Sequence, residues 1–321
     1  MWDRVKAYLS TVIVVLSISI VTRADDGVFK GAGGAVIPSS SEHVRMAAEE
    51  VVLDLTEPGV VHGTCLFVIT NDGPADTLLV GFPDNSPVPD EYRPAIAGPS
   101  TLYDLEIAVD GVPVVTTEVP VRDLVSTGFG EVVSRRAYNR AHVWPCVFTS
   151  GETRVLRTEY RHKLSSMSNA TYIVHYILET GATWAGPIGK VVVRVQPGSM
   201  RQKEPSRDFE WFWTGAEYVW EASDLEPTEN IMLCLDDPLV RARWLAGIWR
   251  NNESRRPAGA QRTPGKFAAD YLHFLGTGDF FETVCAALGD SLPELRDNVR
   301  SAREEMLAER ERNSASSRSH R

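Results

Sequence analysis

The chain of 321 residues lacks the features that mark several well-known classes of protein. It has only four cysteines and no Cys-x-x-Cys unit, so neither a zinc ribbon nor a thioredoxin-type redox centre is indicated. No stretch reaches the ~20 consecutive apolar residues of a membrane-spanning helix. A Gly-x-Ser-x-Gly elbow and a His-x-x-x-His pair are also missing. The sequence therefore contains no recognisable motif of a hydrolase or a metalloprotease.

Basic residues are scarce over most of the chain. Residues 25–240 hold 16 lysines and arginines against 31 aspartates and glutamates, a formal charge of −15, whereas residues 241–321 hold 14 against 11, or +3. Because nucleic-acid binding depends on a basic surface, we expect no nucleic-acid partner for this acidic body. The glycine cluster Gly31–Gly34 lacks the Lys-Ser/Thr of a phosphate loop, and no cofactor or metal site is predicted.

The first 24 residues have the pattern of a secretory signal peptide. Arg4 and Lys6 precede the apolar stretch Tyr8–Val21, which has the length of a signal-peptide core, and small Ala24 marks the expected cleavage site. We therefore expect residues 1–24 to be removed and the mature chain to be extracytoplasmic, either periplasmic or secreted. An uncleaved membrane anchor is the alternative.

From residue 44 to residue 235, short runs of alternating apolar residues recur with turn residues every ten residues or so, which is typical of an antiparallel β-sandwich. The run Val61–Ile69 is one example, and Asn71–Pro74 separates it from Thr77–Phe82, so we expect these two runs to form a hairpin. On one face, the first run presents Val61, Gly63, Cys65, Phe67 and Ile69.

A second hairpin is expected around Asp110-Gly111, because this dipeptide suits a type I′ turn. It lies between the runs Leu105–Val109 and Val112–Thr116. Residues 121–141 instead have a helical periodicity and are expected to form a crossover or surface helix.

The chain changes character at Asp237-Pro238. An aspartate followed by proline is a strong start signal for a helix, and Trp244 and Ile248 begin an apolar stripe at helical spacing. We therefore divide the mature chain into a β-sandwich over residues 25–236, an α-helical region over residues 237–312 and a disordered tail over residues 313–321. The fold class is mainly β, with a small C-terminal helical region.

Aromatic residues gather in one segment, Phe209–Trp220. If Thr214-Gly215 is a two-residue hairpin loop, Trp211 lies opposite Tyr218 and Phe209 lies opposite Trp220. Such an aromatic face either packs in the core or forms a platform for sugars and apolar ligands. Trp184 precedes the turn Gly186-Pro187, either pinned at the sheet edge or exposed as a contact surface. The candidate ligand-binding residues are Trp184, Trp211, Trp213, Tyr218 and Trp220.

The four cysteines are Cys65, Cys146, Cys234 and Cys285. An even number in an exported chain favours at least one disulfide, although the sequence does not choose among the three complete pairings. Buried thiols are the alternative, because three of the four lie in strand-like runs.

Four segments together resemble a known protein family. They are Asp25–Pro38 with Asp-Asp-Gly-Val-Phe at its start, Asn71–Phe82 ending in Leu-Leu-Val-Gly-Phe, Thr183–Lys190 and Leu225–Ile231. In this order, they are similar to exported bacterial proteins catalogued as domain of unknown function 4424, over about residues 25–236. The resemblance implies an extracytoplasmic β-rich domain and transfers no catalytic residue.

The sequence thus predicts an exported, non-catalytic binding or interaction protein of the cell envelope, with an envelope glycan or protein as its partner. One alternative is a hydrolase or metal-dependent enzyme whose site is assembled from distant residues. That alternative predicts His162 or His175 beside carboxylates in a pocket. A third hypothesis assigns partner binding to the helical region.

Overall fold

The structure is a computed structural model of the chain. It describes residues 37–38, 41–84, 102–120, 140–167, 169–202, 209–254, 267–268, 271–272, 275, 278–289 and 292–319. The expected signal peptide, the glycine cluster Gly31–Gly34 and residues 121–139 of the expected crossover helix lie outside the described residues.

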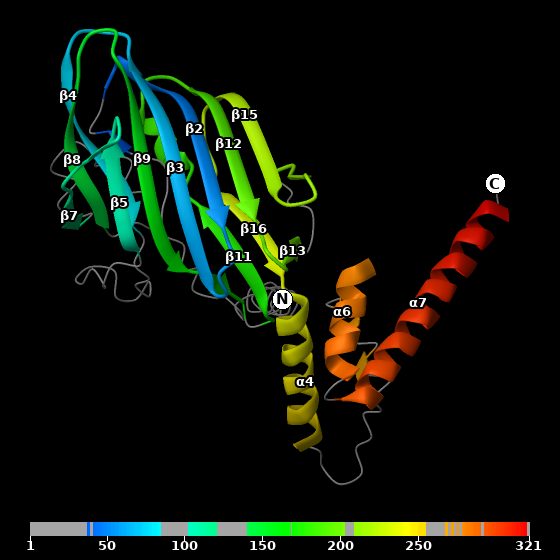
Figure 1. Cartoon of the computed structure of the whole chain (residues 1–321). Coiled ribbons are helices and arrows are strands. Elements are labelled where there is room, and N and C mark those ends of the chain that lie inside the picture. Colours follow the sequence, from blue (N-terminus) through cyan, green and yellow to red (C-terminus); the bar gives the residue numbers. More distant parts are fainter. Residues whose placement is uncertain are drawn as a thin grey trace, which may run out of the picture.

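Eight strands form one large sheet (Figure 1). In spatial order they are β14 (Phe212–Trp213), β15 (Tyr218–Leu225), β12 (Ile188–Gln196), β2 (Val44–Asp54), β3 (Val60–Asn71), β9 (Thr153–Lys163), β5 (Tyr103–Val109) and β6 (Val112–Pro113). Every neighbouring pair is antiparallel except β12 and β2, which are parallel. The predicted mainly β architecture is therefore confirmed, with one parallel pair inside it.

Two four-stranded sheets accompany the large one. The first has the order β1 (Ile37–Pro38), β4 (Asp76–Asp84), β8 (Arg140–Phe148) and β7 (Thr117–Pro120). The second has the order β10 (Ser165–Ser166), β11 (Thr171–Tyr176), β16 (Ile231–Asp236) and β13 (Arg201–Gln202). Figure 1 shows the first at one end of the molecule and the second behind β2, β3 and β12.

Both small sheets cover the same face of the large sheet. In the centre of that sheet, the predicted face of β3 is buried, and the intervening residues of β3 are only half-buried. Phe82 of β4 lies with its ring centroid 5.3 Å from that of Tyr160 on β9. The Tyr176 hydroxyl of β11 donates a 2.6 Å hydrogen bond to Glu49 of β2. One continuous hydrophobic core therefore joins all three sheets.

Tyr160 also explains why β3 carries a glycine in its buried face. A Cβ atom built on Gly63 would lie 2.1 Å from the Tyr160 ring. Only glycine leaves room for this close approach between neighbouring strands.

The first expected hairpin is wrong. β3 lies in the large sheet and β4 in a small one, so Asn71–Pro74 carries the chain from one layer to the other. The buried side chain of Asn71 stabilises this crossing: its amide group donates to the carbonyl oxygens of Pro74 (2.7 Å) and Thr149 (3.1 Å), and its oxygen accepts from Gly73 N–H (3.0 Å). Turn residues alone do not say whether the next strand stays in the same sheet.

The second expected hairpin is confirmed where β5 and β6 pair. Asp110 and Gly111 have φ values of 51° and 78°, as a type I′ turn requires. The Asp110 carboxylate also accepts hydrogen bonds from Val155 N–H (2.9 Å) and from Arg154 Nε (2.8 Å) on β9. These bonds fasten the hairpin tip to the large sheet.

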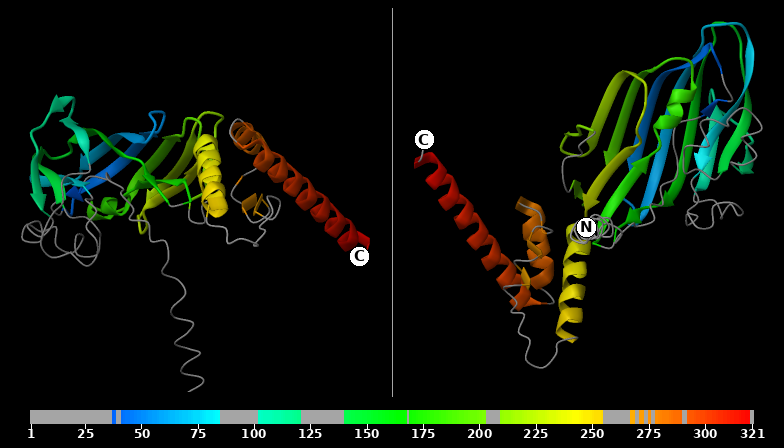
Figure 2. Two further views of the ribbon diagram at one scale, coloured as in Figure 1. Left: turned by 90° about the horizontal axis from the view of Figure 1, so that it is seen from below. Right: turned by 180° about the vertical axis from the view of Figure 1, so that it is seen from behind.

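The C-terminal region is helical, as predicted. α4 (Pro238–Ser254) begins where expected, and Asp237 Oδ1 accepts hydrogen bonds from Leu239 N–H (2.8 Å) and Val240 N–H (2.9 Å). α6 (Gly278–Gly289) and α7 (Pro293–Ser319) follow. These helices share a separate hydrophobic core, and α4 stands between the sheets and the pair α6–α7 (Figure 2).

α7 is longer than the sequence reading allowed. The sequence predicts a helix end at about Arg312 and a disordered tail over residues 313–321, but the helix continues to Ser319. No glycine or proline interrupts residues 294–319, so nothing in that segment breaks the helix. None of the helices in the described residues is both long and apolar enough to cross a membrane.

The side chain of Arg241 joins α4 to the β-strands. It is fully buried and donates hydrogen bonds to the carbonyl oxygen of Asn169, to Thr171 Oγ1 (3.0 Å) and to Asp236 Oδ1 (2.5 Å). Its guanidinium also lies 5.2 Å from the ring centroid of Trp244. The start of the helical region is thereby fixed against β11 and β16.

Candidate functional site

The aromatic segment forms a hairpin, but with a different register from the one expected. Trp213 pairs with Tyr218, and the loop contains the four residues Thr214–Glu217, closed by a hydrogen bond of 3.0 Å from Thr214 N–H to the Glu217 carbonyl. The predicted pairing of Trp211 with Tyr218 is therefore wrong. The shift is two residues, so the face that carries each ring is unchanged.

Most of these aromatic rings pack in the core. Tyr218 and Phe209 are buried, and Trp211 and Trp220 pack against the core while half-buried. Phe209 and Trp220 do meet, with ring centroids 5.2 Å apart in an edge-on arrangement. The flat, open platform considered from the sequence is therefore not present.

Two rings at the end of the hairpin remain accessible. Trp213 is 38% exposed, 4.6 Å from the ring of Tyr218, and the Arg201 guanidinium lies 5.6 Å from its centroid. Phe212 is 69% exposed and points to the opposite face of the sheet. These two side chains are the part of the aromatic hairpin that a ligand can reach without a rearrangement.

Trp184 lies apart from this hairpin and is only 4% exposed. It precedes β12, where Ile188 pairs with Leu225, and Trp213 lies near Tyr218 at the other end of β15. The reading of Trp184 as an exposed contact surface is therefore wrong, because the side chain packs in the core.

No disulfide joins the four cysteines. They lie in different elements: Cys65 in β3, Cys146 in β8, Cys234 in β16 and Cys285 in α6. Burial is the main cause that raises the pKa of Cys65, Cys146 and Cys285, so these three residues are protonated thiols at neutral pH. The expectation of at least one bridge is corrected, and the alternative of buried thiols applies.

The structure buries His162 of β9, which is 4% exposed, whereas His175 of β11 is half-buried. Burial lowers the pKa of His162 to about 4, and His175 and Asp84 lie near enough for their charges to affect it. The pKa of His175 is also lowered by burial. His162 Nδ1 lies 2.9 Å from the carbonyl oxygen of Lys163. Within the described ranges, no three His, Cys, Asp or Glu side chains are grouped so that they could hold a metal ion.

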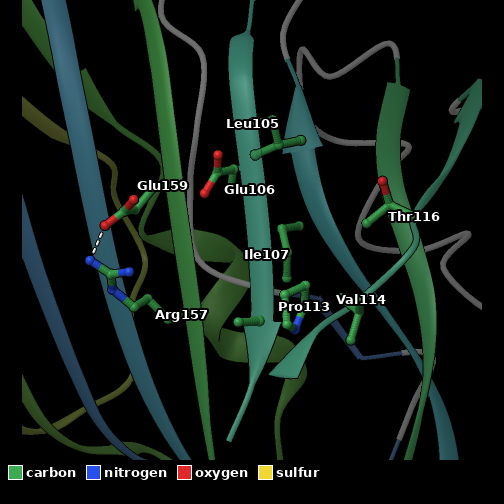
Figure 3. Close-up of a pocket in the computed structure, with 9 residues that line it drawn as sticks. Leu105, Glu106, Ile107, Pro113, Val114, Thr116, Arg157 and Glu159 are labelled. Carbon is green, nitrogen blue, oxygen red and sulfur yellow. Dashed lines mark ion pairs between the residues drawn. The ribbon is translucent and has the colours of Figure 1, made fainter. Parts of the chain in front are cut away.

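A pocket of about 410 Å³ lies at the other edge of the large sheet, beside β5 (Figure 3). Its lining comes from β5, from β6 and the segment after it, and from β9: Leu105, Glu106, Ile107, Ala108, Pro113, Val114, Thr116, Arg157 and Glu159. β6 pairs with Ala108 and Val109 of β5, and Val114 N–H donates a hydrogen bond of 2.9 Å to the Ile107 carbonyl oxygen. The pocket therefore lies where this short hairpin covers the outer edge of β5.

The pocket has a charged side and an apolar side (Figure 3). Glu106 points toward Arg157 and Glu159, which form an ion pair. Leu105 and Ile107 point to the opposite side of β5.

Glu106 lies directly across from Glu159 in the pairing of β5 with β9. Like charges in this position repel each other. Arg157 is paired with Glu159, and among the described residues the Glu106 carboxylate has no hydrogen bond or ion pair. The pocket thus carries one negative charge more than its cation balances.

Sequence reasoning did not find this pocket. Its two glutamates stand more than 50 residues apart, and only the pairing of β5 with β9 brings them together. The one local signal was the Asp110-Gly111 turn, which places Pro113 beside Ala108.

Comparison with solved structures shows a related fold. A crystal structure from Legionella pneumophila, described as a "putative nutrient binding protein", has a TM-score of 0.57 and 19% identity, and the match covers 86% of this chain and 98% of that chain. An M1 zinc metallopeptidase from Deinococcus radiodurans has a TM-score of 0.30 and 11% identity over 61% of this chain and 43% of that chain. Leukotriene A4 hydrolase from Saccharomyces cerevisiae has a TM-score of 0.33 and 10% identity over 62% and 30%. The two peptidase-like matches are too distant to support an argument.

No curated protein matches the sequence. A family model does match it, and the matched range contains Thr183–Lys190, one of the four segments that carry the resemblance noted above. The other three segments lie outside the matched range. The family named from the resemblance is confirmed, because residues 118–202 of this chain match the domain of unknown function DUF4424.

Proposed function

We propose that this chain is an exported, non-catalytic binding protein of the cell envelope whose ligand occupies the pocket beside β5. The observation that carries the proposal is the pocket itself. Its volume of about 410 Å³ falls in the range of small-molecule sites, and it combines an apolar side with a few charged groups. The Legionella pneumophila protein of related fold has a description that names binding, which supports the same reading.

Export is the second part of the proposal. It rests on the basic start, the apolar stretch Tyr8–Val21 and the small Ala24. Fractionation of the native host, followed by N-terminal mass spectrometry, tests it. We expect an extracytoplasmic chain beginning at Asp25. A chain that retains Met1 in the cytoplasmic fraction would contradict export.

Absence of catalysis is the third part. A general base works best with a pKa near the working pH, and burial holds the pKa of His162 at about 4. The alternative of a hydrolase or metal-dependent enzyme requires His162 or His175 to lie beside carboxylates in an accessible pocket. Hydrolysis of a peptide or ester substrate that His162→Gln abolishes in a folded protein would favour that alternative.

The ligand test uses a variant that fills the pocket. The purified chain is incubated with small molecules extracted from the native envelope fraction, and retained compounds are identified by mass spectrometry after release. The control is Ala108→Trp, which places a large ring on the pocket side of β5. We expect a compound that the natural chain retains and the folded variant does not. Equal retention by both, or retention of none, would overturn the proposed site.

An envelope glycan or protein is the partner that suits the exposed end of the aromatic hairpin. Trp213 and Phe212 are reachable there, and Arg201 lies beside Trp213. Titration with cell-wall glycan fragments should quench Trp213 fluorescence, and Trp213→Phe should remove that response. A response that survives in Trp213→Phe would locate the glycan elsewhere.

A further inference from the structure

We infer that the outward face of the second small sheet binds monovalent copper, Cu(I), through the side chains of His175, Met232 and Cys234. His175 lies in β11, and Met232 and Cys234 lie in β16, the strand that pairs with it (Figure 1). This site is separate from the pocket beside β5, so it stands or falls independently of the ligand proposed there.

The three side chains point to the same side of the sheet. In β16, the residues on either side of Met232 and of Cys234 pack in the core between the sheets, so these two side chains face outward. In β11, both neighbours of His175 pack in the same core, so the imidazole faces outward as well. Met232 is 45% exposed, and His175 and Cys234 are half-buried. A metal ion can therefore reach all three from solvent.

The register of the two strands brings these side chains within reach of one ion. His175 lies directly across from Met232, and Cys234 is two residues further along β16. Directly opposite residues of an antiparallel pair have Cβ atoms about 4.5–5.5 Å apart, and diagonal neighbours lie about 7–8 Å apart. The imidazole and the thioether are long enough to span these distances to the shorter thiol. A methionine thus completes a group of ligands that His, Cys, Asp and Glu alone do not form.

The ligand types select a soft metal ion. Thiolate and thioether sulfur atoms prefer Cu(I), and imidazole also binds copper, whereas Mg²⁺ and Ca²⁺ require oxygen ligands. The carboxylate of β16, Asp236, is 5% exposed and is paired with Arg241 at 2.5 Å, so it is engaged elsewhere. Binding replaces the thiol proton of Cys234 by Cu(I), which releases one proton and leaves the oxidation state of copper unchanged.

The protonation and access of the ligands agree with this assignment. Burial lowers the pKa of His175, so its imidazole is neutral at neutral pH and can bind a metal through a ring nitrogen. Cys234 is in no disulfide, and the other three cysteines are buried. Cys234 is therefore the thiol that an ion in solution can reach.

The experiment uses Cu(I) alone as the probe. The purified, reduced chain is loaded with Cu(I) under anaerobic conditions and titrated with bicinchoninate, a chromogenic chelator of Cu(I). We expect one tightly bound Cu(I) per chain, with sulfur and nitrogen ligands in the X-ray absorption spectrum. His175→Gln and Met232→Leu should each weaken Cu(I) binding by at least about tenfold, and Cys234→Ser by more, because each change removes one ligand.

The matched controls are His43→Gln and Met306→Leu, the same changes at an exposed position before β2 and in α7. Both should leave the Cu(I) affinity unchanged. Met232→Leu keeps an apolar side chain at an exposed position, so it tests the site without endangering the fold. Complete transfer of copper from the natural chain to the chelator would overturn the site. Affinities that the ligand variants leave intact, or a copper spectrum without sulfur ligands, would overturn it too.

Discussion

The backbone oxygen of Asn71 accepts a hydrogen bond of 2.9 Å from Gly151 N–H, which ties together two of the places where the chain changes sheets. Asn71 ends β3 on the way to β4, and Gly151 precedes β9 on the way back from β8. The Asn71 side chain adds bonds to Pro74 and Thr149. One buried amide thus stabilises both of these crossings.

Asn71→Ala should lower the free energy of unfolding by about 2–4 kcal/mol, because it leaves several buried carbonyl and N–H groups without partners. Urea denaturation followed by fluorescence measures the change. Asn298→Ala is the control, since this exposed amide donates only to the Glu294 carbonyl one turn back on α7. The control should stay within about 0.5 kcal/mol. Equal effects of the two changes would contradict the role of Asn71.

Glu49 should make the protein less stable as pH rises from 4.5 to 8. Burial raises its pKa from 4.5 to about 8, although the hydrogen bond from Tyr176 opposes this. In this range the Glu49 carboxyl of the unfolded chain has released the proton that the folded chain keeps. The free energy of unfolding therefore falls up to pH 8, and above pH 8 Glu49 causes no further change. The loss is on the order of 4 kcal/mol.

Glu49→Gln should remove most of that slope. Urea denaturation at several pH values from 4.5 to 9 measures it, with Glu50→Gln on the exposed face of β2 as the control. If the slope of the Glu49→Gln variant matches that of the natural chain, Glu49 is already ionised in the folded state.

Burial of His162 should make the protein less stable as pH falls, which is the opposite of the pH dependence that Glu49 causes. Its pKa falls from 6.5 to about 4 on burial, so between these values the unfolded chain binds a proton that the folded chain refuses. Stability should therefore fall as pH decreases from 6.5 to 4, by about 3 kcal/mol. His162→Gln should flatten this decline in thermal unfolding scans, whereas the exposed His43→Gln should leave it in place.

Arg241→Ala should loosen the junction between the sheets and the helical region. It removes the cationic partner of buried Asp236. It also removes the hydrogen-bond donor to the Asn169 carbonyl oxygen and to Thr171 Oγ1. A loss of about 3–5 kcal/mol is expected, since a buried carboxylate is left without its partner. Hydrogen exchange of β16 and α4 should speed up together. Arg243→Ala, exposed on the same helix, is the control and should change neither measurement.

The sequence by itself determined the local structure. The period-two burial of β3, the Asp110-Gly111 turn and the start of α4 at Asp237-Pro238 all follow from short-range rules, and all are present. These features depend on side-chain alternation, on allowed backbone angles and on capping donors, each of which acts within a few residues.

Only the tertiary structure decided which strands pair and which groups meet. The turn at Asn71–Pro74 could not reveal that β4 joins another sheet, and a two-residue slip in the aromatic hairpin left the face pattern of Trp211 and Trp213 unchanged. Glu106 and Glu159 become neighbours only through the pairing of β5 with β9. Pairing between distant strands is chosen by the packing of the whole core, and no short segment of sequence contains that information.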